Sequence, residues 1–227
     1  MNKKYDFIII GGGSSGIVTA SQIIEKLNAT VLIIEEGPSD WHPLIKMPAG
    51  VINFLEKEKF VKHYKTIPQK QLNGRSHHIT QASILGGGSS INGMVYMRGR
   101  PSDYDEWSDS TKEKNWSYQS MLPYFKLVED NNRLFDENHG IGGDLKVSDS
   151  KDTCELTKIY VKTMQAMGHP YNPDFNSGNQ RGVGYMQFTI DQGVRCNATK
   201  AFLSNNKFKK FLTISTKSKA TKIIFKN

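Results

Sequence analysis

The sequence predicts an α/β fold built around a Rossmann-like dinucleotide-binding unit. An uninterrupted apolar run at 5–10 stops at three glycines, which is typical of a buried parallel strand. Residues 14–27 then carry apolar side chains at helical spacing, and a second β-branched apolar strand follows at 30–34. Together these segments form a βαβ unit of about thirty residues, the size expected for one such unit.

Composition places the chain among soluble globular proteins. The 227 residues are 37% hydrophobic and 23% charged, enough for one large domain or one and a half ordinary ones. Cys154 and Cys196 are the two cysteines, so we expect unpaired thiols, a reducing compartment and therefore the cytoplasm. Peripheral attachment to the inner face of a membrane is left open. No apolar run is long enough for a transmembrane segment.

The net charge of +8 comes from one end of the chain. Residues 192–227 hold eight lysines, one arginine and no acid, and their aromatic residues are Phe202, Phe208, Phe211 and Phe225. Basic and aromatic side chains in alternation are compatible with a nucleic-acid groove. A solvated surface is the more usual form of such a charge run, so we expect no nucleic-acid partner.

The remaining pattern predicts an incomplete sheet with a second domain inserted. We expect a dinucleotide-binding domain at 1–143, the beginning of an α+β substrate domain at 144–211, and return strands at 212–227 of a truncated chain. Pro123 is expected near a turn. The individual elements are helices at 50–57, 103–107, 117–129, 155–167 and 198–205, a loop at 131–143, and strands at 145–147, 185–191, 212–215 and 222–225.

The first glycine run is a dinucleotide fingerprint. Gly11 permits the tight turn out of the strand, Gly13 allows close approach of a pyrophosphate, and Gly16 allows close helix–strand packing. The amides at Ser14 and Ser15 open the helix and point at the phosphates. Glu35 ends the second strand at the distance expected for a carboxylate that binds ribose hydroxyls and repels a 2′-phosphate. The adjacent Glu36 is an alternative ribose partner.

A second glycine run extends the prediction from a fold to a family. The run at 85–99, Leu-Gly-Gly-Gly-Ser-Ser-Ile-Asn-Gly-Met-Val-Tyr-Met-Arg-Gly, closely resembles the first signature of the glucose–methanol–choline (GMC) oxidoreductases. The similarity is greatest to the choline-dehydrogenase-like branch. It covers essentially the whole chain and includes matching segments at 34–38, 103–107, 115–118, 122–125, 139–143 and 193–195.

This resemblance implies FAD as the cofactor. Small residues let the backbone pass close to the flavin, the Asn92 amide can bind a flavin edge, and the amides of Gly93, Met94 and Val95 face developing negative charge. Ile91 replaces the histidine that carries covalent FAD in some relatives, which implies a non-covalent flavin. Ala82 and Ser83 stand where the family usually has a glycine and a basic residue. The further cofactor-binding residues that we expect are Gly86, Gly87 and Ala220.

The resemblance also implies a reaction and a missing base. Family members oxidise an alcohol at its CH–OH group: a histidine takes the hydroxyl proton, a hydride passes to flavin N5, and a quinone-type acceptor or oxygen reoxidises the flavin. That histidine is expected beyond the end of this chain, so no catalytic residue is predicted here. The alternatives are a catalytically incomplete FAD-binding fragment and an NAD-dependent enzyme. The neighbours His77 and His78 would point opposite ways on a strand, so no metal site is predicted.

Overall fold

A computed structural model describes residues 3–53, 58–204 and 206–225 and divides into two compact units. The first unit comprises Met1–Gly93 and Gly193–Asn227, and the second comprises Met94–Gln192. Within the described ranges, no helix has the length and apolar character needed to cross a membrane. The expected α/β class, with a core sheet split in sequence, is confirmed by the architecture below.

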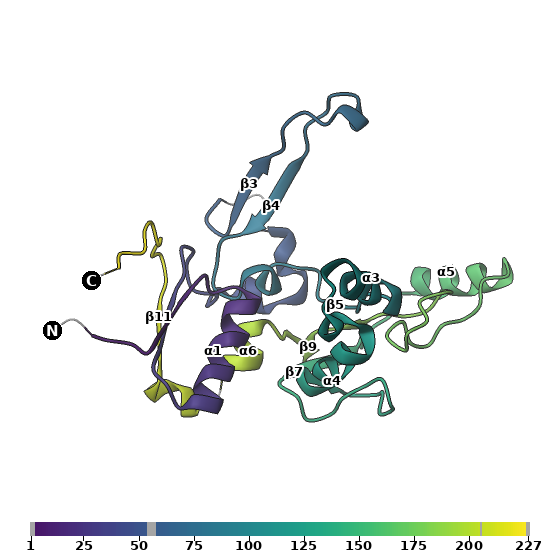
Figure 1. Cartoon of the computed structure of the whole chain (residues 1–227). Coiled ribbons are helices and arrows are strands. Elements are labelled where there is room, and N and C mark those ends of the chain that lie inside the picture. Colours follow the sequence, from purple (N-terminus) through teal and green to yellow (C-terminus); the bar gives the residue numbers. More distant parts are fainter. Residues whose placement is uncertain (1–2, 54–57, 205, 226–227) are drawn as a thin grey trace. The chain divides into compact units, whose positions relative to one another are not determined.

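The first unit is built on a three-stranded parallel sheet in the order β1-β2-β11 (Figure 1). β2 pairs with β1 on one side and with β11, from near the C-terminus, on the other. The end of the chain therefore completes the sheet that its beginning starts. The strands are β1 (Phe7–Ile10), β2 (Val31–Ile34) and β11 (Leu212–Ser215).

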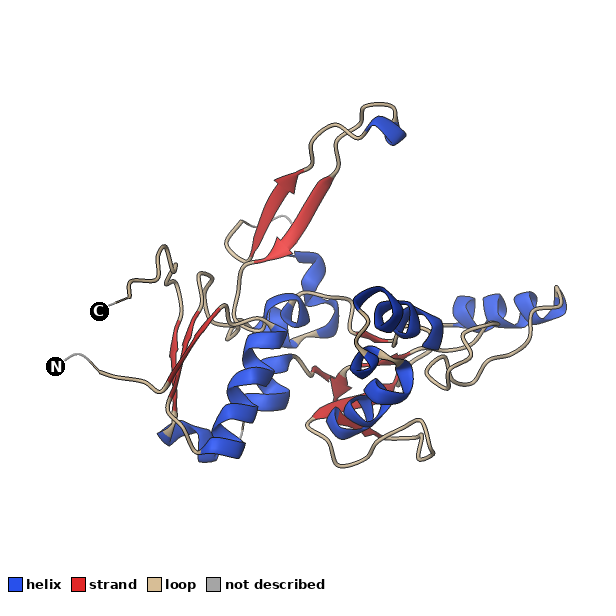
Figure 2. Ribbon diagram, in the orientation of Figure 1, coloured by secondary structure: helices blue, strands red, loops and turns tan. Residues whose placement is uncertain are grey.

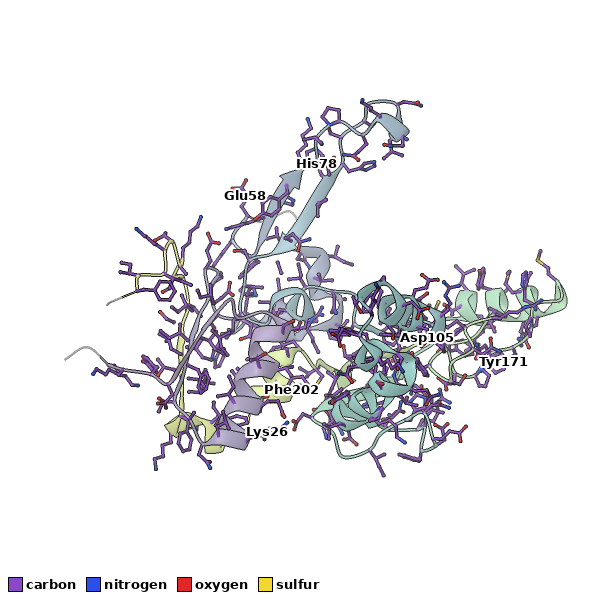
Figure 3. The ribbon with its side chains drawn as sticks, in the orientation of Figure 1. Lys26, Glu58, His78, Asp105, Tyr171 and Phe202 are labelled. Atoms are coloured by element: carbon purple, nitrogen blue, oxygen red, sulfur yellow. The ribbon has the colours of Figure 1, made fainter. Side chains whose placement is uncertain are left out.

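One face of this sheet is covered by helix α1 (Ser14–Leu27), beside which α6 (Ala198–Leu203) packs (Figure 2). The core between helix and sheet consists of Ala20, Ile24, Val31, Ile33 and Phe208. Figure 3 shows Phe202 on α6, which is buried, and Lys26 in the exposed last turn of α1. The 3.6-residue spacing that predicted α1 is thus the spacing of its buried face.

β1 departs from the expectation of a fully buried strand. Ile9 packs against the core, but Ile8 and Ile10 are 59% and 56% exposed. Alternate side chains of a strand point to opposite faces, so Ile8 and Ile10 lie on the face opposite Ile9 and away from the core under α1. The apolar run correctly indicated a parallel strand, while its burial was wrongly predicted for one face.

The interval 41–80 contains a hairpin that its irregular pattern did not reveal. β3 (Val61–Lys65) pairs antiparallel with β4 (His78–Ala82), and the pair rises from the first unit in Figure 1. A small core of Ile45, Phe60 and Ile84 lies at its base. The helix expected at 50–57 is a 3-10 helix at Pro48–Asn53, and 54–57 lie outside the described residues. The remaining elements of the first unit are α2 (Pro43–Lys46), β10 (Val194–Arg195), and the 3-10 turns η2 (Lys70–Leu72), η3 (Gly87–Ser90) and η5 (Asn206–Lys210).

The second unit is a four-stranded sheet in the order β5-β8-β7-β6 with three helices. Pro123 lies inside α4 rather than at a turn, and the strand expected at 185–191 is two short strands. In the first unit, 222–225 do not form the expected strand. The elements are β5 (Val95–Tyr96), α3 (Pro101–Thr111), η4 (Lys114–Trp116), α4 (Tyr118–Val128), β6 (Glu129–Asn131), β7 (Leu145–Asp149), α5 (Glu155–Ala166), β8 (Gln187–Phe188) and β9 (Ile190–Asp191).

The division into units differs from the boundaries expected at 143/144 and 211/212. β6 pairs with β7 across the first of these positions, and the inserted unit already begins at Met94. The expected boundaries separate cofactor-binding from substrate-binding segments, whereas the two units are separated by packing. That the expected segments are domains of a complete protein stays a prediction.

A buried polar network holds the second unit together. The Glu129 side chain, fully buried, accepts a hydrogen bond from His139 Nδ1 at 2.8 Å and pairs with Arg98 at 2.5 Å. His139 Nε2 donates to Asp174 at 3.0 Å. Burial opposes the charged imidazole, but hydrogen bonds to Asp174 and Glu129 outweigh it and raise the pKa of His139 to about 9.

This network predicts a pH-dependent stability for the second unit. The His139 pKa is raised in the folded state, so its stabilising contribution is fully present below its ordinary value of 6.5 and is lost as pH rises through about 9. We expect the free energy of unfolding, measured by urea denaturation, to fall across that window. His139→Gln should be less stable at pH 6 and should show a shallower decline. Parallel pH profiles for the two proteins would contradict this.

Candidate cofactor site

The first glycine run turns the chain from β1 into α1. Gly11 has a φ of +98°, and its amide donates to the Ile34 carbonyl at 2.8 Å. A Cβ on Gly16 would lie 2.1 Å from the Gly11 oxygen and 3.1 Å from Ile9 Cγ2. The fold therefore requires glycine at both positions, for the turn and for helix–strand packing, as the fingerprint predicted.

The N-terminus of α1 is the electropositive end of the site. Gly13 is the N-cap in an extended conformation, and no side chain caps the helix. The amides of Ser14, Ser15 and Gly16 lie in the first turn, where helix geometry supplies no intrahelical acceptor. No acidic residue occupies that turn. Donor groups together with the helix dipole make this end suited to an anion such as a pyrophosphate.

Glu35 lies against the same loop from the end of β2. Its side chain accepts hydrogen bonds from the amides of Gly12 and Gly37, each at 2.7 Å. The residue is buried, with 8% of its surface exposed. Glu36 is instead paired with Lys62 at 2.6 Å, and the hydrogen bond from that lysine lowers the pKa of Glu36. The contacts favour Glu35 over Glu36 as the residue that belongs to the glycine turn.

A cavity of about 260 Å³ opens at the carboxyl ends of these strands. Gly11, Glu35 and Ala220 line it, so three residues expected at the cofactor share one cavity although they come from distant parts of the sequence. Lys62 and Tyr64 of β3 also line it, and these two were missed because the hairpin was not predicted. Their i and i+2 positions on one strand place both on the same face, which is the signal that a recognised strand would have given.

The second glycine run packs directly on the first. The Gly86 amide donates to the Gly12 carbonyl at 2.7 Å. A Cβ on Gly87 would lie 2.7 Å from the Gly13 Cα. Gly86 and Gly87 have φ values of +88° and +55°, the left-handed region that favours glycine. The two runs thus form one surface at the start of α1.

Side chains from the segment after β10 hold the second run in place. Ser90 is fully buried, donates to the Leu85 carbonyl at 2.8 Å and accepts from Asn197 at 2.9 Å. Arg195 Nη1 donates to both the carbonyl and the side-chain oxygen of Asn92, each at 2.8 Å. The sequence offered only the Gly-x-Arg match at 193–195 as a signal for this support.

The last predicted flavin residues follow at the junction of the units. A Cβ on Gly93 would meet no atom within 4 Å. Met94 begins the second unit with a φ of +61°, and its carbonyl accepts from the Thr189 amide at 2.8 Å. Val95 is in β5 and pairs with Phe188. The proposed stabilisation of reduced flavin by these amides stays a prediction.

Three side chains of metal-ligand type gather in the second unit of the described chain. Asp136, His139 and Asp174 lie close enough to hold a metal, yet His139 already donates from both ring nitrogens to carboxylates. Cys154 is exposed and Cys196 is buried, and neither cysteine forms a disulfide within the described residues.

Comparison with known proteins identifies the family. The family model for GMC oxidoreductases matches residues 5–227. The chain belongs to the GMC oxidoreductase family. It is 38% identical to an alcohol dehydrogenase [acceptor] of Pseudomonas putida over 98% of this chain and 40% of that protein. An oxygen-dependent choline dehydrogenase of Photobacterium profundum is 36% identical over 100% of this chain and 40% of its own length. The chain thus spans about 40% of the length of these relatives.

Solved structures of this family have the same fold. Pyridoxine 4-oxidase from Mesorbium loti matches with a TM-score of 0.87 and 32% identity over 94% of this chain and 42% of its own. A formate oxidase from Aspergillus oryzae RIB40, studied for its FAD modification, matches with a TM-score of 0.81 and 26% identity over 95% and 39%. The choline-dehydrogenase-like resemblance of the sequence is confirmed at the level of the family.

The contact between the two glycine runs makes a prediction about neighbouring residues. Gly87→Ala places a Cβ against the Gly13 backbone at a positive φ, and we expect it to lower the free energy of unfolding by about 1–3 kcal/mol. Gly88→Ala is the matched control, because its Cβ would meet nothing within 4 Å. Urea denaturation of both variants checks this, and equal losses would show that the runs do not depend on the contact.

Proposed function

We propose that this chain forms the FAD-binding part of an enzyme that oxidises the CH–OH group of an alcohol, with choline or another primary alcohol as donor. The cofactor expectation is confirmed by the family match and by FAD-associated structural neighbours. FAD supplies the hydride acceptor when bound. The chain's own residues supply the cradle for its phosphates and ribose.

One observation carries this proposal: Gly13 is a glycine that the protein itself does not need. Its φ is −79°, and a Cβ there would meet nothing nearer than the Gly87 Cα at 3.9 Å. Gly11 and Gly16, by contrast, are required by the turn and by packing. Empty space beside the first-turn amides of α1 is the room that a pyrophosphate would fill.

Residues near the pyrophosphate space are proposed to contact the ribose and the flavin of the cofactor. Glu35 has one hydrogen bond on each carboxylate oxygen and retains lone pairs that can accept from ribose hydroxyls. Its negative charge repels a 2′-phosphate, which disfavours an NADP-type cofactor. Ala220 lines the same cavity as Glu35 and Gly11. Ile91 supports a flavin that is held without a covalent bond.

The proton acceptor is proposed to lie outside residues 1–227. His139 is buried between Glu129 and Asp174, so its ring nitrogens are occupied. His139 is therefore assigned a role in stabilising the second unit and not in taking a proton from the substrate. The electron acceptor is proposed to be oxygen or a quinone-type molecule, and the protein is proposed to be cytoplasmic. By itself, this chain would bind FAD and would not oxidise the alcohol.

The test separates binding from folding at Gly13. Gly13→Ala should unfold at nearly the same denaturant concentration as wild type, because the added methyl group meets no protein atom in close contact. It should nevertheless weaken FAD binding at least about tenfold, because the methyl occupies the pyrophosphate space. Titration of FAD fluorescence against each protein measures this.

Ligand controls make the outcome specific to FAD. Wild type should retain FAD through gel filtration and should bind NADP⁺ at least about tenfold more weakly. Preferential binding of NAD⁺ or NADP⁺ would overturn the proposed cofactor. Unchanged FAD affinity in Gly13→Ala would remove the site from the first glycine run.

A further inference from the structure

A second cavity of about 450 Å³ lies in the first unit, apart from the residues that line the Glu35 cavity. Its walls come from the segment that leads into α2 and from the residues around α6. The residues that matter to its chemistry are Asp40, Lys46, Arg195, Asn197, Thr199 and Lys200. None of them belongs to the fingerprint or to the second glycine run.

Arg195 is a buried cation with no carboxylate bonded to it among the described residues. Only 2% of its surface is exposed, and its Nε and Nη1 donate to carbonyl and amide oxygens of Ile45, Ser89 and Asn92. Its Nη2 is buried and has no hydrogen-bond partner in the described part of the chain. Burial without a compensating charge lowers the pKa of Arg195 to about 10. Such a group is stabilised by a nearby anion.

A second buried donor lines the same cavity. Thr199 Oγ1 is buried and lacks a hydrogen-bond partner within the described residues. It belongs to a different element from the arginine, so the two unsatisfied groups are independent observations. Unsatisfied buried polar atoms are uncommon in folded proteins, and both residues that carry them line this cavity.

The charges around the cavity are predominantly positive. Lys46, Arg195 and Lys200 oppose the single carboxylate of Asp40, which leaves a formal charge of +2. The Asp40 carboxylate accepts a hydrogen bond from Asn197 at 2.8 Å. Lys46 is held over the Trp41 ring, 4.5 Å from its centroid, at the edge of the cavity. This arrangement attracts an anion and repels a cation.

We propose that this cavity binds a small oxyanion of the phosphate, sulfate or carboxylate class, with Arg195, Thr199 and Lys46 as its ligands. A guanidinium fork and a hydroxyl match the separated oxygens of such an anion, and a charge-assisted hydrogen bond is the strong interaction available to a buried arginine.

Occupancy of the cavity is coupled to the proposed flavin residue Asn92. The same guanidinium that faces the anion holds the Asn92 side chain and backbone through Nη1. An anion that fixes Arg195 therefore fixes Asn92 as well, and by linkage FAD and the anion raise each other's affinity. This coupling rests on the proposed function, whereas binding of the anion does not.

Phosphate titration at constant ionic strength, with chloride as the replaced ion, tests the site. Calorimetry on the whole chain should show a saturable site that the Arg195 and Thr199 variants weaken, and thermal unfolding should shift upward with the same concentration dependence. Thr199→Val should weaken phosphate binding about 2- to 12-fold, as expected for loss of one neutral hydrogen bond. Arg195→Lys should weaken it by more, about 10-fold or greater, because the fork is lost.

Matched surface variants and FAD distinguish the outcomes. Thr80→Val and Lys65→Gln alter exposed residues of the hairpin and should leave phosphate binding unchanged. Gly13→Ala should still bind phosphate even if it no longer binds FAD, so the two proposals fail separately. Absence of saturable binding, equal weakening by Thr80→Val, or mole-for-mole displacement of phosphate by FAD would overturn the proposal. If Arg195→Lys does not fold, Thr199→Val decides.

Discussion

The contact between the two glycine runs is the constraint on which the first unit depends. The Gly12 carbonyl accepts from the Gly86 amide, and a methyl group on Gly87 would lie only 2.7 Å from the Gly13 Cα. The local sequence of either glycine run does not determine this contact, because it joins residues that are far apart in the chain. Glycine adopts the left-handed φ values found at Gly86 and Gly87 without strain, and the hydrogen bonds of Ser89, Ser90 and Asn197 fix the loop in that conformation.

This constraint explains why the site is assembled from both ends of the chain. β11 must pair with β2 to bring Ala220 to the cavity that Gly11 and Glu35 line. The segment from Arg195 to Thr199 must pack beneath the second run to hold Ser90 and Asn92. The inserted second unit is stabilised by different interactions. A buried polar network centred on Glu129 adds to its apolar core.

The sequence predicted the parts of this structure that local physics determines. α1 and the strand pair around it follow from apolar spacing and glycine punctuation, and Gly11 and Gly16 have the conformational and packing roles expected. The hairpin at 61–82 was missed because β3 and β4 are mostly exposed and polar, so no alternation of apolar side chains marks them. Exposure of Ile8 and Ile10 depends on which sheet face is covered, and that is a tertiary property. Pro123 is accommodated within α4, where the local rule indicated a turn.

Arg195 shows why the support of a site is harder to predict than its binding surface. A glycine fingerprint is local, since each small residue is explained by a turn or by a ligand near it. The arginine acts on Ile45, Ser89 and Asn92, three positions far from it in sequence. Its burial without a carboxylate opposes folding, and the bonds to those oxygens offset only part of that cost. Within the described residues Nη2 has no hydrogen-bond partner, and the same guanidinium holds the side chain of Asn92, which is proposed to bind the flavin.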